Sequence, residues 1–206
     1  MNFDIWKFIA GYFAIDLLKE LIWHKSSWAV SPKGPVDFRK RDQWTHTEPL
    51  RRGNSGTVQT LQWMARLARK DASDPRVRAL ALQIARNCPG HGFQCEIAAI
   101  FHYVRDKITY RKDPITQERV QDTIRTCFQF GSGDCDDKSV ALAGLLGSLA
   151  HKSRFCVIGH SNNNFSHVYV EVYTDGEWIA LDPTPERAQL GWAAESSHRA
   201  VFPIWR

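Results

Sequence analysis

Cys135 is the residue best suited to chemistry in this sequence, because it stands between a glycine-rich turn and an apolar helical pattern. The turn is Gly131–Asp134, and leucines recur at helical spacing after Cys135, at Leu142, Leu145, Leu146 and Leu149. Asp134 is a favoured helix-capping residue, which places the Cys135 thiol in the first turn of a helix. Unpaired backbone N–H groups and the helix dipole stabilise a thiolate there, so we interpret Cys135 as a nucleophile.

Three aspartates, Asp134, Asp136 and Asp137, flank this cysteine. Their negative charge raises the pKa of a neighbouring thiol unless a cation compensates, and we expect that cation to be a histidine. Asp136 and Asp137 resemble metal ligands in type, but carboxylates at a helix start more often offset the helix dipole. Acyl transfer by a thiol needs no metal, so we predict neither a catalytic metal nor another cofactor.

A second informative region predicts an antiparallel hairpin. The segments Ser166–Tyr173 and Trp178–Asp182 alternate in polarity, and Asp175-Gly176 between them is typical of a two-residue turn. The face with Val168, Val170 and Val172 is expected to pack on the helix that follows Cys135. The other face then carries the chemistry.

In this register Tyr169 faces Asp182, and Asp182 is a diagonal neighbour of His167, with roughly 7–8 Å between their backbones. A carboxylate that holds one imidazole nitrogen, so that the other points at a thiol, is the arrangement that a cysteine nucleophile requires. Two alternatives stay open: His167 is an ordinary strand histidine, or Asp182 only shapes the Asp-Pro turn. A β-bulge in the hairpin would also shift the register that brings the two residues together.

An oxyanion stabiliser is also needed. The backbone N–H of Cys135 is the default donor, and Gln129 and Gln121 in the preceding segment are candidates for a second one. The alternative is that these glutamines are ordinary polar loop residues. His160, beside a run of asparagines, is interpreted as solvated or adjacent to substrate.

The chain has five cysteines, an odd number without repeating spacing, which favours a reducing, cytoplasmic compartment with at least one free thiol. Cys127 and Cys156 lie in apolar surroundings and are expected to be inert. Cys88, His91 and Cys95 lie close together and suggest part of a zinc site, but a clear fourth ligand is missing. We therefore favour a turn between two helices.

Composition and charge set limits on the class of protein. With 206 residues, 43% hydrophobic and 24% charged, the chain is neither collagen-like nor wholly disordered, and a mean hydropathy of −0.38 argues against a polytopic membrane protein. The net charge of +5 is modest, and the sequence has no nucleic-acid-binding motif. The longest apolar run near the N-terminus, Phe8–Ile15, is too short to span a bilayer, and a secretory signal is not expected.

Three regions are predicted along the chain. Residues 1–25 form an aromatic, amphipathic helix; residues 26–56, rich in proline, glycine and basic residues, form an extended arm or linker; and residues 57–206 form one catalytic domain. Within that domain, helices are predicted from Thr57, from about Pro75 and over residues 94–107.

Four segments together resemble the transglutaminase-like superfamily with its papain-like thiol core: Gly133–Asp137, Ser166–Tyr169, Leu181–Thr184 and the helix end Tyr103–Tyr110. The resemblance covers about residues 57–190. It implies an α+β fold in which a helical N-terminal half packs on an antiparallel β-sheet. It also implies Cys135 as nucleophile, His167 as general base and acid, and Asp182 as its orienting partner.

The leading hypothesis is therefore a cysteine-dependent enzyme that hydrolyses or transamidates a peptide or protein amide through a thioester. The chain also resembles proteins of this kind encoded by tailed bacteriophages. The alternative is accordingly a phage virion or assembly protein that keeps the fold and docks on a structural partner through residues 1–56. A zinc or nucleic-acid module is a third hypothesis, which bound metal or salt-dependent DNA affinity would reveal.

Overall fold

The computed structural model describes residues 51, 53–113, 119–161 and 164–205. The predicted N-terminal helix (1–25) and nearly all of the predicted arm (26–56) lie outside these residues, as does the docking role assigned to them. Among the described residues, no helix combines the length and the apolar character needed to cross a membrane.

Helices form the first half of the described chain: α2 (Asn54–Ala72), α3 (Pro75–Ile84), α4 (Phe93–Lys107) and α5 (Cys135–Ser148), with short helical turns η1 (Pro89–His91) and η2 (Arg125–Phe130). The predicted helices are confirmed, although α2 begins at Asn54 rather than Thr57. The start of α3 follows from local chemistry, because Asp74 accepts a hydrogen bond from the Arg76 backbone N–H (2.8 Å) and Pro75 fits the first helical position.

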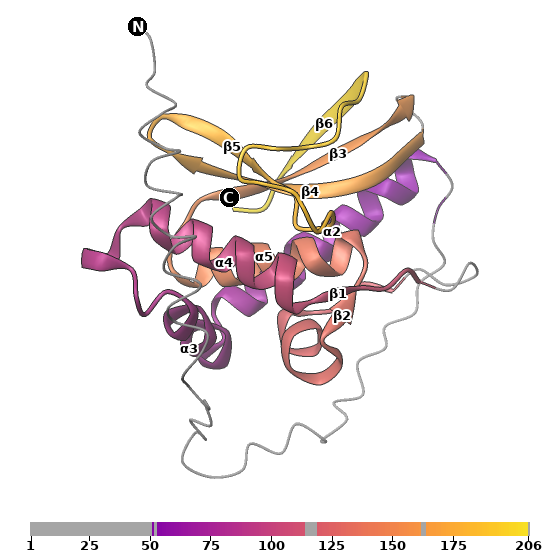
Figure 1. Cartoon of the computed structure of the whole chain (residues 1–206). Coiled ribbons are helices and arrows are strands. Elements are labelled where there is room, and N and C mark those ends of the chain that lie inside the picture. The colour runs from indigo at the N-terminus through magenta and orange to yellow at the C-terminus, as the bar shows by residue number, and fades with distance from the viewer. Residues whose placement is uncertain (1–50, 52, 114–118, 162–163, 206) are drawn as a thin grey trace, which may run out of the picture. The chain divides into compact units, whose positions relative to one another are not determined.

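Strands form the second half: β3 (Ser153–Ser161), β4 (Asn164–Thr174), β5 (Glu177–Leu181) and β6 (His198–Pro203). They pair antiparallel in the order β5-β4-β3-β6. Figure 1 shows this sheet on one side of the helices. The predicted α+β fold, with a helical half packed on an antiparallel sheet, is confirmed.

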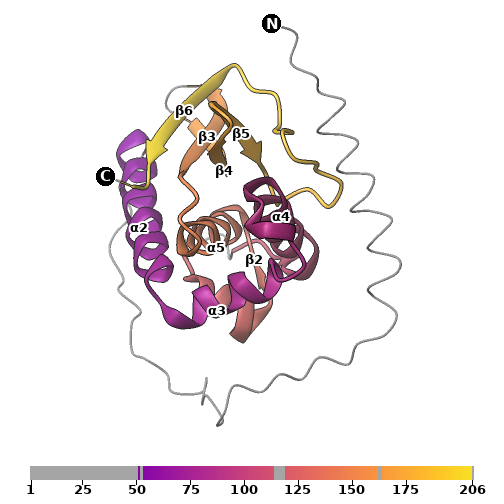
Figure 2. The ribbon, with the colours of Figure 1, turned by 90° about the vertical axis from the view of Figure 1, so that its left-hand side faces the viewer.

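The helix α5 lies at the centre of the fold. Figure 2 looks nearly along it and shows α2, α3 and α4 around it, with the sheet above. Every residue of α5 is buried except Cys135 and Gly147, and the buried residues include the charged Asp136, Asp137 and Lys138 near its start. The inner face of β4, with Val168, Val170 and Val172, belongs to the same core, as predicted.

The hairpin register is also confirmed. Val170 pairs with Leu181 and Thr174 pairs with Glu177, on either side of a two-residue turn. Asp175 and Gly176 both have positive φ angles, 52° and 87°, which is the backbone conformation that an Asp-Gly turn supplies. Asp182 therefore follows directly after a strand whose register the turn fixes.

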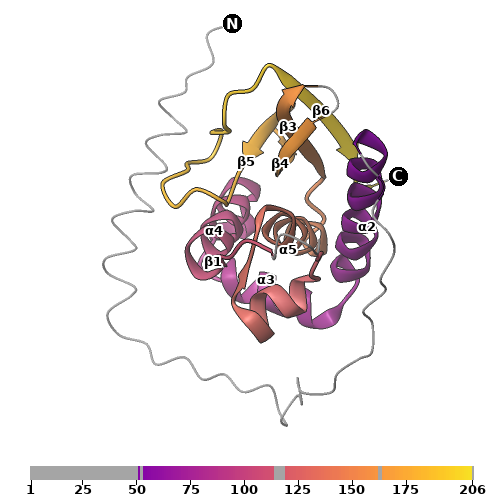
Figure 3. The same cartoon turned by 90° about the vertical axis from the view of Figure 1, so that its right-hand side faces the viewer.

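The chain between β5 and β6 covers the outer face of the sheet. The Gly191 N–H donates to the Ala180 carbonyl (2.8 Å), and Ser196 Oγ donates to the Gly159 carbonyl (2.7 Å). Figures 2 and 3 show this yellow segment leaving β5, passing near α4 and returning to β6. The segment places new side chains beside the outer face, where His167 lies.

The cysteines differ from expectation in one respect. Cys88 and Cys95 form a disulfide with a Cα–Cα distance of 5.5 Å, while Cys127, Cys135 and Cys156 are free. Thiols that are joined to each other cannot bind zinc, so a zinc site on this pair is wrong, and the segment is the turn η1 between two helices. Disulfides are typical of oxidising compartments. The reducing compartment therefore stays a prediction, and the disulfide does not favour it.

Candidate active site

Cys135 is the first residue of α5, as predicted, and its thiol is free and half-buried. The N-cap is Asp134, whose backbone N–H donates to Oδ2 of Asp137 (3.3 Å). A Cβ atom at Gly133 would lie only 2.4 Å from the Asp137 Cβ, so only glycine fits at this point. The glycine-rich turn is thus required for the helix start that presents the thiol.

A short parallel strand pair fixes the chain just before the nucleophile. Strand β1 (Thr109–Tyr110) follows α4 and pairs with β2 (Ser132–Gly133). The Thr109 N–H donates to the Gly131 carbonyl (2.9 Å), and the Arg111 N–H donates to the Gly133 carbonyl (3.0 Å). The position of Cys135 therefore depends on the end of α4 as well as on α5.

His167 and Asp182 are in direct contact. The distance from His167 Nε2 to Asp182 Oδ2 is 2.7 Å, and the other carboxylate oxygen, Oδ1, accepts the Thr184 backbone N–H (3.1 Å). The Asp182 side chain is fully buried at 0% exposure, whereas that of His167 is 22% exposed. The buried carboxylate thus holds Nε2, and Nδ1 is the nitrogen available for proton exchange.

The start of α5 meets β4 beside His167. Ser139 Oγ donates to the carbonyl of Val168, the residue after His167, at 3.3 Å. Ser139 follows Cys135 by one helical turn, an axial separation of about 6 Å. The structure therefore brings His167 and Asp182 into contact, and it places Cys135 one helical turn from the point where α5 touches β4.

The two glutamines proposed as oxyanion donors lie in different surroundings. Gln121 is held by Asp137, which accepts its backbone N–H at Oδ1 (2.6 Å) and its side-chain amide at Oδ2. Gln129 lies on an exposed part of η2. The structure thus brings Gln121 to the start of α5, where it supports the helix cap. The oxyanion role of either residue stays a prediction.

Burial changes the charge of the helix start. It raises the pKa of the Asp137 carboxyl to about 7; the charge of Asp134 adds to this shift, and hydrogen bonds from Gln121 oppose it. Asp137 is therefore partly protonated near neutral pH. The first turn of α5 carries less negative charge than three adjacent aspartates would suggest, which favours a thiolate at Cys135.

Ligand atoms of Asp134, Cys135 and Asp136 lie within 4.8 Å of one another. They come from consecutive residues at one helix start, where carboxylates are expected in order to offset the dipole. The predicted absence of a catalytic metal stays a prediction.

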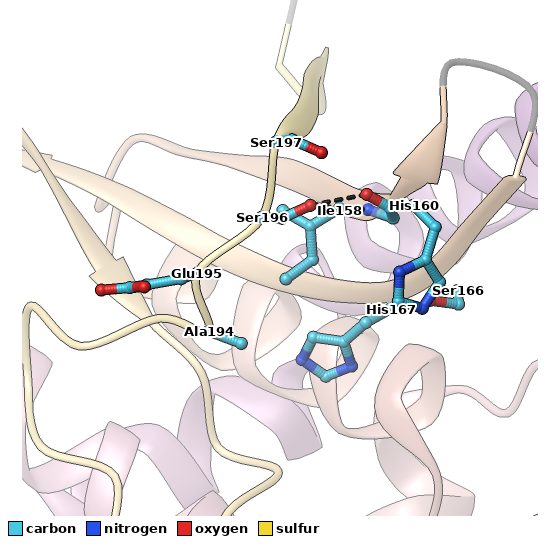
Figure 4. A pocket seen from close by; sticks show the side chains of 9 residues that line it. Ile158, His160, Ser166, His167, Ala194, Glu195, Ser196 and Ser197 are labelled. Atoms are coloured by element: carbon cyan, nitrogen blue, oxygen red, sulfur yellow. Dashed lines mark hydrogen bonds between the residues drawn. The ribbon is translucent and has the colours of Figure 1, made fainter.

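A pocket of about 360 Å³ opens beside His167. Its walls come from the end of β3, the start of β4 and the segment before β6, with lining residues Ile158, Gly159, His160, Ser166, His167, Ala194, Glu195, Ser196 and Ser197. Figure 4 shows His160 and Ser166 on one side and Ala194 on the other, with the Ser196 bond to Gly159 closing the wall. His160 lines this pocket and is exposed, and a position adjacent to substrate stays a prediction.

The remaining free thiols are unsuited to nucleophilic chemistry. Burial raises the pKa of the Cys127 thiol to about 12, and burial also raises the pKa of the Cys156 thiol. Thiolates are scarce at neutral pH under these conditions. The structure therefore supports the interpretation of both residues as inert.

Two residues near the site had no clear signal in the sequence. Tyr110, which is 47% exposed, lies near the nucleophile. Partial burial is the largest cause of its raised pKa, and the nearby charges of Cys135 and Asp134 raise the pKa further. Lys138 is buried within α5. Its position in an apolar helix could have marked it, because an unpaired lysine is rarely buried.

Comparison with known proteins gives a family model and a set of distant structures. A model described as the transglutaminase-like superfamily matches residues 78–183, a range that contains Cys135, His167 and Asp182. A search of curated proteins found no match.

Three solved structures illustrate the structural similarity. A proposed cysteine protease from Cytophaga hutchinsonii is 17% identical, with 64% of this chain and 54% of that chain covered and a TM-score of 0.44. A proposed protease from Parabacteroides distasonis is 14% identical, with 61% and 27% covered and a TM-score of 0.48. The periplasmic domain of TgpA from Pseudomonas aeruginosa is 21% identical, with 57% and 48% covered and a TM-score of 0.41. The chain thus spans about half of these proteins or less.

Proposed function

Because this chain belongs to the transglutaminase-like superfamily, we propose that it is a cysteine-dependent acyl-transfer enzyme whose catalytic triad is Cys135, His167 and Asp182. Its substrate is a peptide or protein amide. The observation that carries the proposal is the 2.7 Å contact between His167 and the buried Asp182. His167 lies on β4, the strand that α5 touches through Ser139.

The reaction begins with proton transfer from the Cys135 thiol to Nδ1 of His167. The sulfur attacks the amide carbonyl carbon, and the carbonyl oxygen becomes an oxyanion. The backbone N–H of Cys135, at the positive end of α5, is in the region that stabilises this charge. His167 then gives its proton to the leaving nitrogen, the C–N bond breaks, and a thioester on Cys135 remains.

The second half of the reaction uses the same residues. Water or an amine attacks the thioester carbonyl, His167 accepts a proton from the attacking atom, and the Cys135 sulfur leaves as a thiolate. Hydrolysis and transamidation differ only in this acceptor. Asp182 keeps the imidazole oriented in both halves and stabilises its protonated form.

The pocket beside His167 suggests where the leaving group lies. His167 protonates the leaving nitrogen, so the part of the substrate attached to that nitrogen must lie on the His167 side of the thiol. The pocket there has an apolar floor from Ile158 and Ala194 and a polar rim that includes Ser166 and Ser197. It has room for one side chain of the leaving segment, and the acceptor would enter by the same route.

Trapping of the thioester tests this proposal. A short p-nitrophenyl ester is mixed with the protein, and intact-mass and peptide mass spectrometry locate the acyl group. We expect one acyl group on Cys135, which water releases slowly and a primary amine such as ethanolamine releases as an amide if the enzyme transamidates. Variants Cys127→Ser and Cys156→Ser are matched controls that should acylate normally. Acylation of another residue, or of none, would refute the proposal.

A further inference from the structure

One wall of the pocket beside His167 does not belong to the four-stranded sheet. This wall is the segment Ala194–Ser197, which leads into β6, whereas the opposite wall comes from the end of β3 and the start of β4. Figure 4 shows the methyl group of Ala194 directed toward the imidazole of His167. Binding specificity commonly lies in loops that a rigid scaffold positions, so the contacts that hold this wall are informative.

Hydrogen bonds from Ser196 hold the wall against the sheet. Ser196 Oγ donates to the Gly159 carbonyl (2.7 Å) and accepts the Gly159 backbone N–H (3.2 Å). One side chain thus bonds both main-chain groups of a residue on β3. Nearer β5, the bond from the Gly191 N–H to the Ala180 carbonyl (2.8 Å) holds the same segment.

Apolar contacts anchor the wall as well. Ala193 and Ala194 pack against a small cluster formed by Cys156, Ile158 and Tyr169, each of which is at most 6% exposed. This cluster is separate from the main core, so the segment has a packing site of its own. The position of Ala194 is therefore fixed by packing on one side and by the Ser196 bonds on the other.

The pocket is apolar next to His167 and polar at its rim. Ile158 and Ala194 supply carbon atoms there, while Ser197 lies at the rim. Figure 4 shows the carboxylate of Glu195 directed away from His167. A group that enters beside His167 meets carbon atoms, and the side chain at position 194 limits its size.

We propose that this wall determines specificity for the residue whose amine leaves or accepts the acyl group: Ala194 leaves room for an apolar side chain beside His167, and Ser196 holds Ala194 in place. The preferred amine is the α-amine of an apolar residue such as leucine rather than that of glycine. Ala194 contacts the substrate, and Ser196 is a positioning residue that acts through Ala194. This inference rests on the proposed function, because it requires an acyl group on Cys135.

Competition between two amines for one acyl-enzyme tests the inference. The protein is acylated with p-nitrophenyl acetate in an equimolar mixture of leucinamide and glycinamide, and mass spectrometry measures the two acetylated products. The uncatalysed reaction, measured with Cys135→Ala, is subtracted. Amide formation is the reverse of amide cleavage, so the acceptor occupies the site of the leaving amine. We expect wild type to favour leucinamide about tenfold.

Two variants change the wall. Ala194→Leu fills the pocket and should lower the preference to below about twofold. Ser196→Ala releases the wall and should lower it by about threefold, as expected from the loss of ordinary hydrogen bonds. If Ala194→Leu does not fold, Ser196→Ala supplies the comparison. Ala200→Leu, at an exposed alanine of β6 outside the pocket, is the matched control and should keep the wild-type ratio.

The product ratio separates specificity from stability, because both amines compete for the same acyl-enzyme and a loss of active protein leaves the ratio unchanged. A wild-type acyl-enzyme that accepts neither amine, or both equally, would overturn the inference. A wild-type ratio in both Ala194→Leu and Ser196→Ala would also overturn it. Failure of the proposed function looks different, because the wild-type protein would then form no acyl group on Cys135.

Discussion

Replacement of Cys135 by alanine is expected to remove the acyl adduct and to lower kcat/KM by at least about 10³-fold. The sulfur is the atom that forms the thioester, and no other described free thiol can replace it, because desolvation raises the pKa of both Cys127 and Cys156. Cys135 is half-buried at the first position of α5, so its truncation removes little packing. The melting temperature should therefore stay near that of wild type.

Turnover of the p-nitrophenyl ester and of a peptide amide measures this effect. Cys127→Ala is the matched control: the same change at another half-buried thiol should leave kcat/KM within about twofold. If Cys135→Ala kept more than a few per cent of wild-type turnover while Cys127→Ala lost it, the nucleophile would be misassigned.

Replacement of Asp182 by asparagine is expected to lower kcat by about 10³- to 10⁴-fold with little change in KM. Asparagine has the same shape and still accepts the Thr184 N–H, but it is neutral. It no longer stabilises the protonated imidazole, and its amide group can present a donor to Nε2 and so favour the wrong tautomer. Because Asp182 is fully buried behind His167, it has no place in substrate binding.

Steady-state kinetics of Asp182→Asn test this expectation, with Asp175→Asn as the control. Asp175 lies in the turn of the same hairpin, and asparagine tolerates the positive φ angle at that position. The control should keep its wild-type kcat. A raised KM with an unchanged kcat for Asp182→Asn would show that the carboxylate binds substrate instead of orienting His167.

The parts of this site that could be predicted from sequence depend on short-range chemistry. Asp175-Gly176 admits one tight turn, and that turn sets the register that brings Asp182 to His167. Asp134 likewise caps a helix within a few residues of Cys135. In both places a few adjacent residues determine the backbone, so the pattern in the sequence is sufficient.

The parts that could not be predicted depend on contacts between distant segments. Strands β1 and β2 have two residues each, and their pairing depends on how α4 packs on α5. The pocket depends on the segment before β6, which returns across the sheet to place Ala194 near His167. The Cys88–Cys95 disulfide likewise depends on how closely the fold brings the two cysteines together. An odd number of cysteines in the sequence does not indicate this pair.

Gln121 and Lys138 show the same limit for single side chains. The position of Gln121 before the nucleophile favours an oxyanion donor, yet its side chain donates to Asp137 in the helix cap and to the Ser132 carbonyl. Lys138 is buried beside the end of α4, through a contact between distant segments that no local pattern predicts. The phage origin and the docking role of residues 1–56 stay predictions, because the family model covers residues 78–183 only.

The pH dependence of alkylation of each free cysteine, followed by mass spectrometry in wild type and in His167→Ala, tests the central claim most directly. A thiol paired with His167 should react well below pH 8.5, about the ordinary pKa of cysteine, whereas Cys127 and Cys156 in the same sample should not. We predict selective labelling of Cys135 at pH 6–7 in wild type and its loss in His167→Ala. Labelling of Cys135 with the same pH profile in both proteins would contradict the thiol–imidazole pair on which the proposed function depends.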